Sequence, residues 1–322
     1  MIDRYRILTI PALLLVVTFA FGGTPKPGVT PDTYARPAMR VDVDGHRSLN
    51  VRCDGHGDVT IMLEAGTGAD SSAWFRMQPL LARHGRVCSY DRAGYGFSSG
   101  RTDLHNIDSE VDDLHRVMSA LAIHRPVILV GHSMGTNIVR RYATRYPEDV
   151  RALVLLDPPP QDLASYMSAQ WMKDDAEANS QRDAFLAACE NGARHHALPP
   201  GCMDKPADWM SPRVASAEAA RRAQPDYWQT FRAELAANEA ELRAPVSHAE
   251  DHGSIPLIVL SAADTYKDVP EPDRSGLEAA RKATQTAIAA TSSRSSIVIV
   301  KNSGHDINLD QPGIAVDTIL AH

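Results

Sequence analysis

Short apolar runs recur along the chain from residue 38 onward, and they predict β-strands. Eight runs fit this description: Met39–Val43, Leu49–Cys53, Val59–Leu63, Val87–Tyr90, Val127–Val130, Ala152–Leu156, Pro256–Leu260 and Ser296–Val300. Several of them are continuously apolar, which is expected of strands that are buried on both faces of a parallel sheet.

Helical patterns lie between the predicted strands. The segment 107–121 places apolar side chains at helical spacing, at Ile107, Val111, Leu114, Met118 and Leu121. Met134–Tyr146 and Gly276–Ala290 are further predicted helices. Because strands and helices alternate, the sequence predicts the α/β class, with a doubly wound and mostly parallel central sheet.

The alternation stops at Pro158–Pro160 and resumes near Ile255. The residues between have helical character and no convincing strand. One amphipathic face, bounded by Pro225 and Pro245, consists of Trp228, Phe231, Leu235 and Leu242. We therefore predict a core of residues 38–157 and 251–322, with a helical cap insertion over residues 158–250 that covers one face of the sheet.

The N-terminus has the pattern of a secretory signal. Arg4 and Arg6 precede the apolar run Ile7–Phe21, and small residues follow it. We expect residues 1–23 to be a signal peptide and residues 24–37 a linker, which predicts a secreted or periplasmic protein. An uncleaved membrane anchor is the alternative, although the run is shorter than the roughly 20 residues that span a bilayer.

Composition and charge exclude some functions. The chain of 322 residues has 33 basic and 40 acidic residues, a net charge of −7, and no basic run that could follow a phosphate backbone. Nucleic-acid binding is therefore not expected. The four cysteines suit two disulfides in an exported protein, and none forms a Cys-x-x-Cys pair, which argues against a structural zinc site.

The motif with the clearest chemistry is Gly131-His132-Ser133-Met134-Gly135, of the form G-x-S-x-G. It follows a predicted strand and precedes a predicted helix, which is the context that a nucleophile elbow requires. The sharp turn would hold Ser133 in a strained backbone conformation and expose its hydroxyl above the sheet. We predict that Ser133 is the nucleophile. The structural alternative is a glycine-rich turn whose serine caps the helix.

A serine nucleophile needs a base and an acid that orients the base. Where this elbow occurs, the order along the chain is serine, acid, histidine. His305, directly after the final strand, is the predicted base. Asp264, after the strand Pro256–Leu260, is the predicted acid; Asp157 and Asp268 are the alternatives. For His132 we expect a packing or capping role.

Two backbone N–H groups should form the oxyanion hole. Met134, the residue after the nucleophile, supplies the first. We predict that Thr67 supplies the second from the loop Glu64–Ala69, with Gly66 or Gly68 as alternatives. This loop lacks the Lys-Ser/Thr ending of a P-loop, so nucleotide binding is not expected.

These segments together resemble the α/β-hydrolase superfamily. The elbow, the loop Leu63–Gly68, the turn Tyr90–Ser98 and the terminal Ser303-Gly304-His305 carry the resemblance, which covers about residues 38–158 and 255–320. It departs from the common pattern at Glu64-Ala65-Gly66, where many members have His-Gly, and at Arg92-Ala93-Gly94. We expect the turn Asp91–Ser98 to be structural.

The resemblance implies carboxylic-ester hydrolysis through an acyl-enzyme, without a metal or an organic cofactor. In this fold the second strand runs antiparallel beside the fourth, which implies a disulfide Cys53–Cys88; Cys189 and Cys202 bracket a Gly/Pro-rich loop inside the insertion and are expected to form the second disulfide. The expected partner is a small molecule, an apolar ester. The alternatives are a lactone or amide substrate, a cofactor-free haloperoxidase or lyase, and a ligand-binding protein with negligible turnover. Contact with a membrane is expected only if the N-terminal segment is retained.

Overall fold

The computed structural model describes residues 29–101, 105–123, 125–203 and 205–322. The predicted signal peptide and the first five residues of the predicted linker lie outside these ranges. The rest of the linker packs against the protein: the Thr30 amide and hydroxyl both donate to the Trp209 carbonyl, at 2.8 and 3.0 Å. Tyr34 is buried in the same cluster as Trp209.

All eight predicted strands are present, and they form one sheet in the order β1-β2-β4-β3-β5-β6-β7-β8. The strands are β1 (Met39–Asp42), β2 (Ser48–Asp54), β3 (Thr60–Glu64), β4 (Arg86–Tyr90), β5 (Val127–His132), β6 (Val150–Leu156), β7 (Leu257–Ala262) and β8 (Ser295–Val300). β2 is antiparallel to both of its neighbours, and the pairs from β4 through β8 are all parallel.

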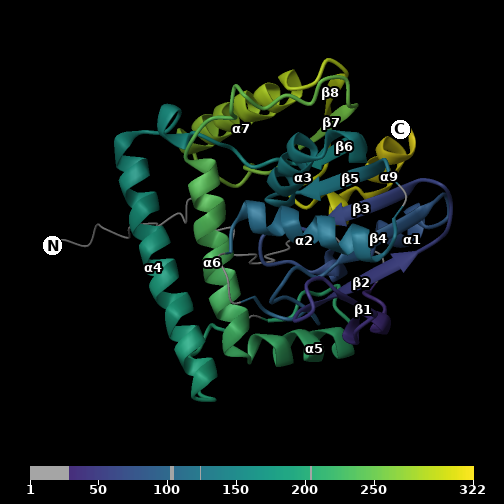
Figure 1. The fold of residues 1–322 in the computed structure, drawn as a ribbon. Coiled ribbons are helices and arrows are strands. Elements are labelled where there is room, and N and C mark those ends of the chain that lie inside the picture. Colours follow the sequence, from purple (N-terminus) through teal and green to yellow (C-terminus); the bar gives the residue numbers. More distant parts are fainter. Residues whose placement is uncertain (1–28, 102–104, 124, 204) are drawn as a thin grey trace.

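Each of the three core segments predicted to be helical contains a helix. The helices around the sheet are α1 (Gln78–Leu81), α2 (Ile107–Ala120), α3 (Gly135–Arg145), α7 (Asp273–Ala290), α8 (Ile307–Asp310) and α9 (Pro312–Leu320). Between β6 and β7 lie the longer α4 (Ala169–Arg194), then α5 (Pro212–Arg222) and α6 (Pro225–Leu242), and the described residues of that interval contain no strand. Figure 1 shows α6 between α4 and the core, with α5 running below the sheet.

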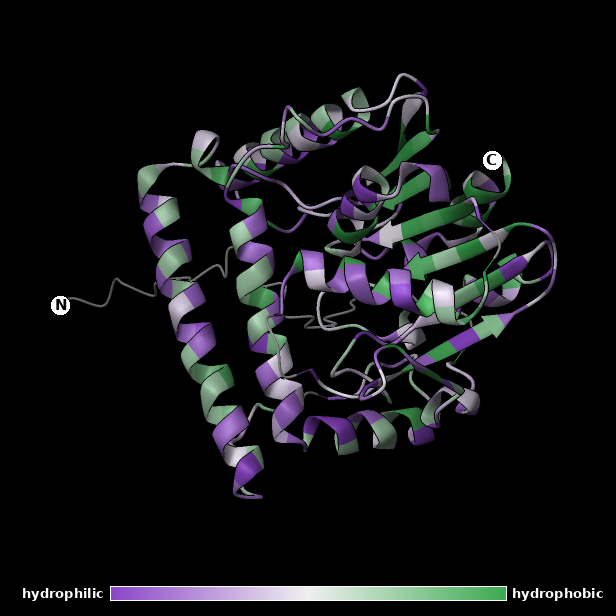
Figure 2. Ribbon diagram, viewed as in Figure 1, coloured by the Kyte–Doolittle hydropathy of each residue, from purple (hydrophilic) through white to green (hydrophobic). Residues whose placement is uncertain are grey.

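The core has two layers because successive strand residues point to opposite faces. In β5, Val127 and Leu129 pack with residues of α2 and α3, whereas Ile128 and Val130 pack with residues of α1 and α9. The central strands are accordingly the most uniformly hydrophobic elements in Figure 2. Because β3, β5, β6 and β8 run in the same direction, their carboxyl ends lie at one edge of the sheet.

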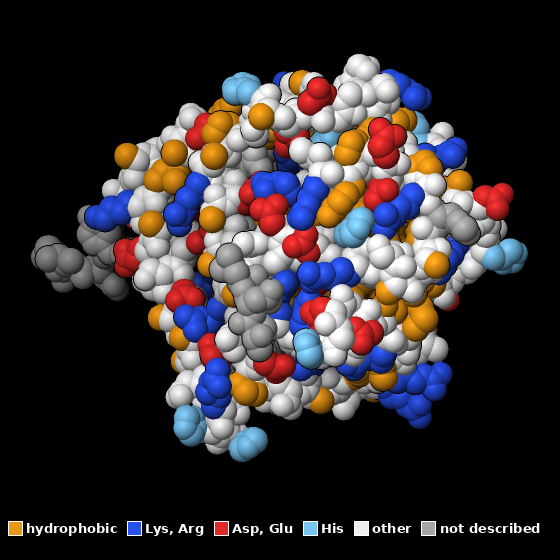
Figure 3. Space-filling model, in the orientation of Figure 1, with side chains coloured by type: hydrophobic (Ala, Val, Ile, Leu, Met, Phe, Trp, Pro, Cys, Tyr) orange, Lys and Arg blue, Asp and Glu red, His pale blue; other side chains and the backbone are white. Residues whose placement is uncertain are grey.

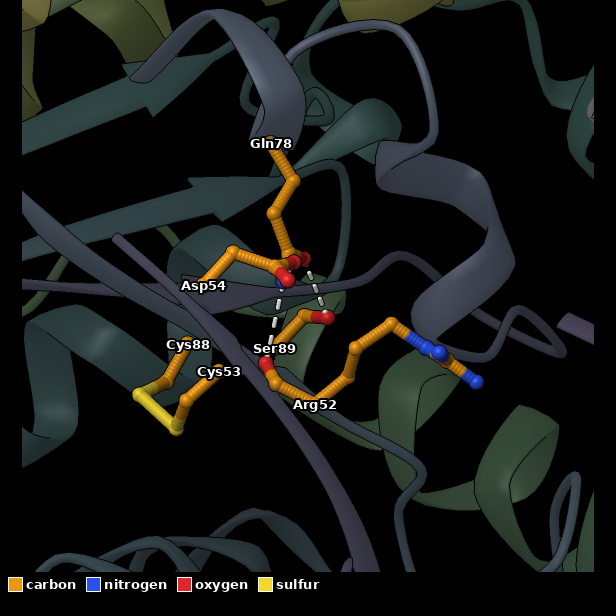
Figure 4. Close-up of a disulfide and its surroundings, with 6 residues drawn as sticks. All are labelled: Arg52, Cys53, Asp54, Gln78, Cys88 and Ser89. Carbon is orange, nitrogen blue, oxygen red and sulfur yellow. Dashed lines mark hydrogen bonds between the residues drawn. A yellow bond between two sulfur atoms is a disulfide. The ribbon is translucent and has the colours of Figure 1, made fainter. Parts of the chain in front are cut away.

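Both expected disulfides are confirmed. The antiparallel register of β2 and β4 places Cys53 directly opposite Cys88, and these two cysteines are bonded. Figure 4 shows Gln78 at the same strand pair, where it donates to the Arg52 carbonyl and to Asp54 and accepts from Ser89. The second bridge, Cys189–Cys202, joins the end of α4 to the loop before α5.

The surface agrees with the composition. Positive and negative side chains are interspersed over the face drawn in Figure 3, rather than gathered into a basic stripe. Among the described residues, no helix is both long and apolar enough to cross a membrane.

Candidate active site

Ser133 lies in a tight turn between β5 and α3. Its backbone has a φ of +53°, the left-handed conformation that an elbow requires and that side chains other than glycine's rarely adopt. The Ser133 amide donates to the Leu156 carbonyl of β6 at 3.0 Å, and the Thr136 hydroxyl donates to the Ser133 carbonyl at 2.7 Å. These bonds hold the turn in a conformation that would otherwise be strained.

The two glycines of the motif occupy positions where no side chain would fit. A Cβ atom at Gly135 would lie 2.4 Å from the Glu64 carbonyl oxygen, and one at Gly131 would lie 2.6 Å from the Gly135 carbonyl oxygen. Helix α3 can therefore begin directly against the loop after β3 only because these positions lack side chains. The close approach brings that loop beside Ser133.

His305 lies on the loop between β8 and α8 and is paired with a buried carboxylate. Its Nδ1 lies 2.9 Å from Oδ2 of Asp157, and its Nε2 is buried without a hydrogen-bond partner among the described residues. Because a carboxylate accepts, Nδ1 carries the proton in the neutral ring, which leaves the lone pair on Nε2 available. Such a ring can accept a proton from a hydroxyl group.

Asp157, and not Asp264, is the carboxylate that contacts His305, so the prediction of Asp264 as the orienting acid is wrong. Asp157 directly follows β6, is 1% exposed and also accepts from the Thr265 hydroxyl at 2.8 Å. Asp264 is partly exposed; its amide donates to the Ser303 carbonyl, and its carboxylate has no hydrogen bond or ion pair within the described part of the chain. Asp268 is exposed.

The carboxylate that contacts His305 comes from the strand nearer to Ser133. Asp157 directly follows β6, which pairs with β5, whereas Asp264 follows β7, which lies between β6 and β8. Helix α7 then covers Asp157, to which Arg281 and Gln285 donate at 2.8 and 3.2 Å. Both of these residues went unnoticed in the sequence, although their spacing of four places them on one face of a helix.

The electrostatics of the pair favour an ionised Asp157. Burial alone would raise the pKa of Asp157, but the hydrogen bond from His305 and the nearby charges outweigh it and lower that pKa. For His305, burial disfavours the charged ring, yet the hydrogen bond and the negative charge of Asp157 raise its pKa above the ordinary 6.5.

His132 has a more specific role than the packing expected from the sequence. Its Nε2 lies 3.0 Å from the His305 carbonyl oxygen, and the two rings lie 4.8 Å apart. Burial, and then repulsion from His305, lower the pKa of His132 to about 4, so the ring is neutral near pH 7. A neutral His132 that donates to this carbonyl fixes the loop that carries His305.

Of the two residues predicted for the oxyanion hole, Met134 directly follows Ser133 and Thr67 directly follows Gly66 in the loop after β3. Thr67 and Met134 are both buried, and within the described ranges the backbone N–H of neither has a hydrogen-bond acceptor. A Cβ atom at Gly66 would lie 3.1 Å from the Cβ of Ser133, so this loop passes directly beside the serine. Two unpaired N–H groups near a serine hydroxyl can bind a developing negative charge.

The turn after β4 supports the same loop. Asp91 is buried and accepts from the Ser71 and Phe97 amides and from Asn50, which agrees with a structural role. Arg92 goes further, because its guanidinium donates to the carbonyls of Ala65 and Gly66, both at 2.7 Å. This contact was not foreseen from the sequence.

Comparison with known proteins gives a consistent picture of the fold. Residues 59–265 match the family described as the alpha/beta hydrolase fold. The uncharacterized protein YqjL of Bacillus subtilis is 25% identical over 84% of this chain and 86% of its own. Matches to three further curated relatives cover only 36% to 56% of those proteins.

Two solved structures illustrate the likeness in three dimensions. A serine hydrolase involved in carbazole degradation has a TM-score of 0.59 and 19% identity, with 88% of this chain and 96% of its own covered. A thermophilic esterase from Thermogutta terrifontis has a TM-score of 0.53 and 19% identity, with 88% and 97% covered. At these identities the likeness concerns the fold alone.

Replacing the two competing carboxylates separately should distinguish them. Asp157→Asn should lower kcat for hydrolysis by about 10⁴-fold, as the corresponding change does in a serine-protease triad, because the ring loses its fixed tautomer. Asp264→Asn should change kcat by no more than about twofold, because the Asp264 carboxylate binds no other group among the described residues and most such substitutions change free energies by less than about 0.5 kcal/mol. Equal losses in the two variants, or a larger loss in Asp264→Asn, would contradict the geometry.

The pH dependence should report the pairing of His305. A base must be neutral to accept a proton, so kcat/KM should fall as the pH drops through the pKa of His305. Since Asp157 raises that pKa, the midpoint of the acid limb should lie above 6.5. Initial rates between about pH 5 and 9 would measure it; a midpoint below 6.5 would show that burial of the ring outweighs the effect of Asp157 on His305.

Proposed function

Because the chain belongs to the α/β-hydrolase fold family, we propose that it is a secreted serine hydrolase that cleaves carboxylic esters. The observation that carries this proposal is the Asp157–His305 hydrogen bond, which leaves Nε2 of His305 unpaired, while the His305 ring lies 4.8 Å from the ring of His132, the residue before Ser133. Hydrolysis in general agrees with the family. To this general activity the proposal adds a serine nucleophile, an ester substrate and secretion.

Acylation is the first half of the proposed reaction. Ser133 Oγ attacks the carbonyl carbon of the ester while Nε2 of His305 takes the hydroxyl proton. The tetrahedral oxyanion is held by the N–H groups of Met134 and Thr67, and Asp157 stabilises the charged ring of His305. His305 then returns the proton to the departing alkoxide, which leaves as an alcohol, and the acyl group remains on Ser133.

Deacylation repeats the same steps with water. Nε2 of His305 removes a proton from a water molecule while the water oxygen attacks the acyl carbon. The N–H groups of Met134 and Thr67 hold the second oxyanion. The intermediate collapses when His305 protonates Ser133 Oγ, and a carboxylic acid is released. In the structure, Ser133 Oγ and His305 Nε2 are not hydrogen-bonded to each other; in such sites this contact commonly tightens when substrate binds.

A cavity of about 690 Å³ between α4 and α6 supports a substrate of small to medium size. Thr67, which supplies one proposed oxyanion donor, lines this cavity, so the reacting carbonyl and the cavity can belong to one site. Its apolar wall consists of Leu163, Met172, Leu186, Leu235 and Leu242, and charged side chains of both signs line the rest, among them Asp175, Arg182, Asp183, Arg232 and Glu239. An apolar acyl chain would bury its surface there, with a gain of about 0.8 kcal/mol per methylene group.

Export is supported by the cysteines and by the sequence of the N-terminus. All four cysteines are in disulfides, which form and persist in oxidising compartments. The basic start and short apolar run of residues 1–23 match a signal peptide.

The proposal predicts ester turnover that depends on Ser133. The purified chain from residue 24 onward should hydrolyse p-nitrophenyl esters, with an optimum chain length set by the cavity. Ser133→Ala should lower kcat by about 10⁴- to 10⁶-fold because it removes the nucleophile. The rate of p-nitrophenol release at saturating ester measures the optimum chain length and the loss of kcat in Ser133→Ala.

The Ser133→Ala variant also provides the control. Equal turnover by the wild type and the variant would mean that another group cleaves the ester. If neither turned over although a fluorophosphonate labelled Ser133, the serine would be activated but the ester assignment would be wrong.

A further inference from the structure

A buried arginine holds the carbonyls of the proposed oxyanion loop. Arg92 is 1% exposed; its Nη1 donates to Glu64 Oε1 at 2.9 Å and to the Ala65 carbonyl at 2.7 Å, and its Nη2 donates to the Gly66 carbonyl at 2.7 Å. The rigid fork of a guanidinium group suits such a set of acceptors, which a lysine could not bind in the same geometry. Arg92 therefore fixes two consecutive peptide groups of the loop.

The orientation of these peptides determines where the Thr67 N–H points. In a trans peptide the C=O and N–H groups point in opposite directions. Because the Gly66 carbonyl is bonded to Arg92, the N–H of Thr67 is directed away from Arg92. That N–H has no acceptor among the described residues, which suits a donor reserved for a substrate oxygen.

The carboxylate of Glu234, on the cap helix α6, completes this arrangement. Its Oε1 accepts from the Gly68 amide at 2.6 Å, and its Oε2 accepts from Arg92 Nη2 and Nε at 3.0 and 3.1 Å. Glu234 is 2% exposed, and a charge so buried requires such partners. One side chain of the cap thus binds both the loop and the arginine that orients it.

Helix α6 packs closely on the loop and also lines the cavity that we propose holds the substrate. A Cβ atom at Gly68, where φ is +70°, would lie 2.8 Å from the ring of Phe231, so the helix approaches the backbone itself. One turn further along, Leu235 and Asn238 line the cavity between α4 and α6. The helix that would contact the substrate is therefore the helix that holds the oxyanion loop.

We infer that Glu234 is a positioning residue for the oxyanion hole, and that it couples the seating of the cap helix α6 to stabilisation of the transition state. The inference rests on the proposed function, because it concerns the same serine-hydrolase site. It assigns to the cap a contribution to kcat in addition to substrate binding. Substitution of Glu234 should then affect the transition state more than the bound ester.

The test compares two glutamates of α6. Glu241 also joins this helix to the core, through Arg141 of α3 at 3.1 Å, but has no contact with the oxyanion loop in the described structure. Glu234→Ala should lower kcat for a p-nitrophenyl ester by about 10²-fold, the effect of losing one oxyanion donor, with KM changed by less than about threefold. Glu234→Gln keeps an acceptor for the Gly68 amide and should recover part of kcat.

The control variants, Glu241→Ala and Glu241→Gln, should retain kcat within about twofold. The inference is overturned if Glu234→Ala behaves like Glu241→Ala in kcat, or if its loss appears only in KM or in thermal stability. If Glu234→Ala does not fold, Glu234→Gln and Arg92→Lys replace it. Both should lower kcat with little change in KM, and a normal kcat in both would equally overturn the inference.

A second readout separates this inference from the proposed function. The rate at which a fluorophosphonate labels Ser133 also depends on stabilisation of a negatively charged oxygen, and it should fall in parallel with kcat in Glu234→Ala. A wild-type protein that neither hydrolyses esters nor reacts with the probe would remove the proposed function and this inference together. An active wild type with fully active Glu234→Ala would remove the inference alone.

Discussion

The left-handed backbone of Ser133 is the constraint around which the proposed site is arranged. A non-glycine residue in this conformation costs about 1–3 kcal/mol, and it persists only where the surrounding structure enforces it. Here the bond from Ser133 to Leu156 and the contact of Gly135 with the loop after β3 enforce it. Both contacts come from the strands on either side of β5, because β3 and β6 are its neighbours in the sheet.

The same strand order explains where the other groups of the site come from. The loop after β3 supplies Thr67, the end of β6 supplies Asp157, and the loop after β8 supplies His305. Since these strands are parallel, their carboxyl ends meet at one edge of the sheet, which is where ligands bind in open α/β folds. The chemistry that we propose thus depends on the strand order. Helix α6 of the cap insertion adds Glu234 and part of the cavity wall.

Much of this arrangement could be predicted from the sequence, because it depends on local patterns. Short apolar runs, several of them continuous, identified every strand, and the G-x-S-x-G motif between a strand and a helix identified the turn at Ser133. The pairing of Cys53 with Cys88 followed from the resemblance to a known fold. The choice between Asp264 and Asp157, by contrast, depends on where the loop after β8 places His305, which the strand pattern alone does not describe.

The contacts that were missed join residues far apart in the chain. Arg92 and Glu234 are separated by 142 positions, and their ion pair depends on how α6 packs against the core. Likewise, Arg281 meets Asp157 only after α7 has packed over the end of β6. A charged residue directly after an apolar strand, as at Asp157, is the kind of local signal that could have favoured the correct carboxylate.

The central claim is that Ser133 carries the acyl group during turnover. The most direct measurement is to mix the protein with p-nitrophenyl acetate, quench in acid at successive times, digest and determine the mass of the peptide that contains Ser133. We predict that this peptide gains one acetyl group early in the reaction and loses it when the ester is exhausted. Turnover without an adduct on this peptide at any time, or with an adduct on another peptide, would contradict the account.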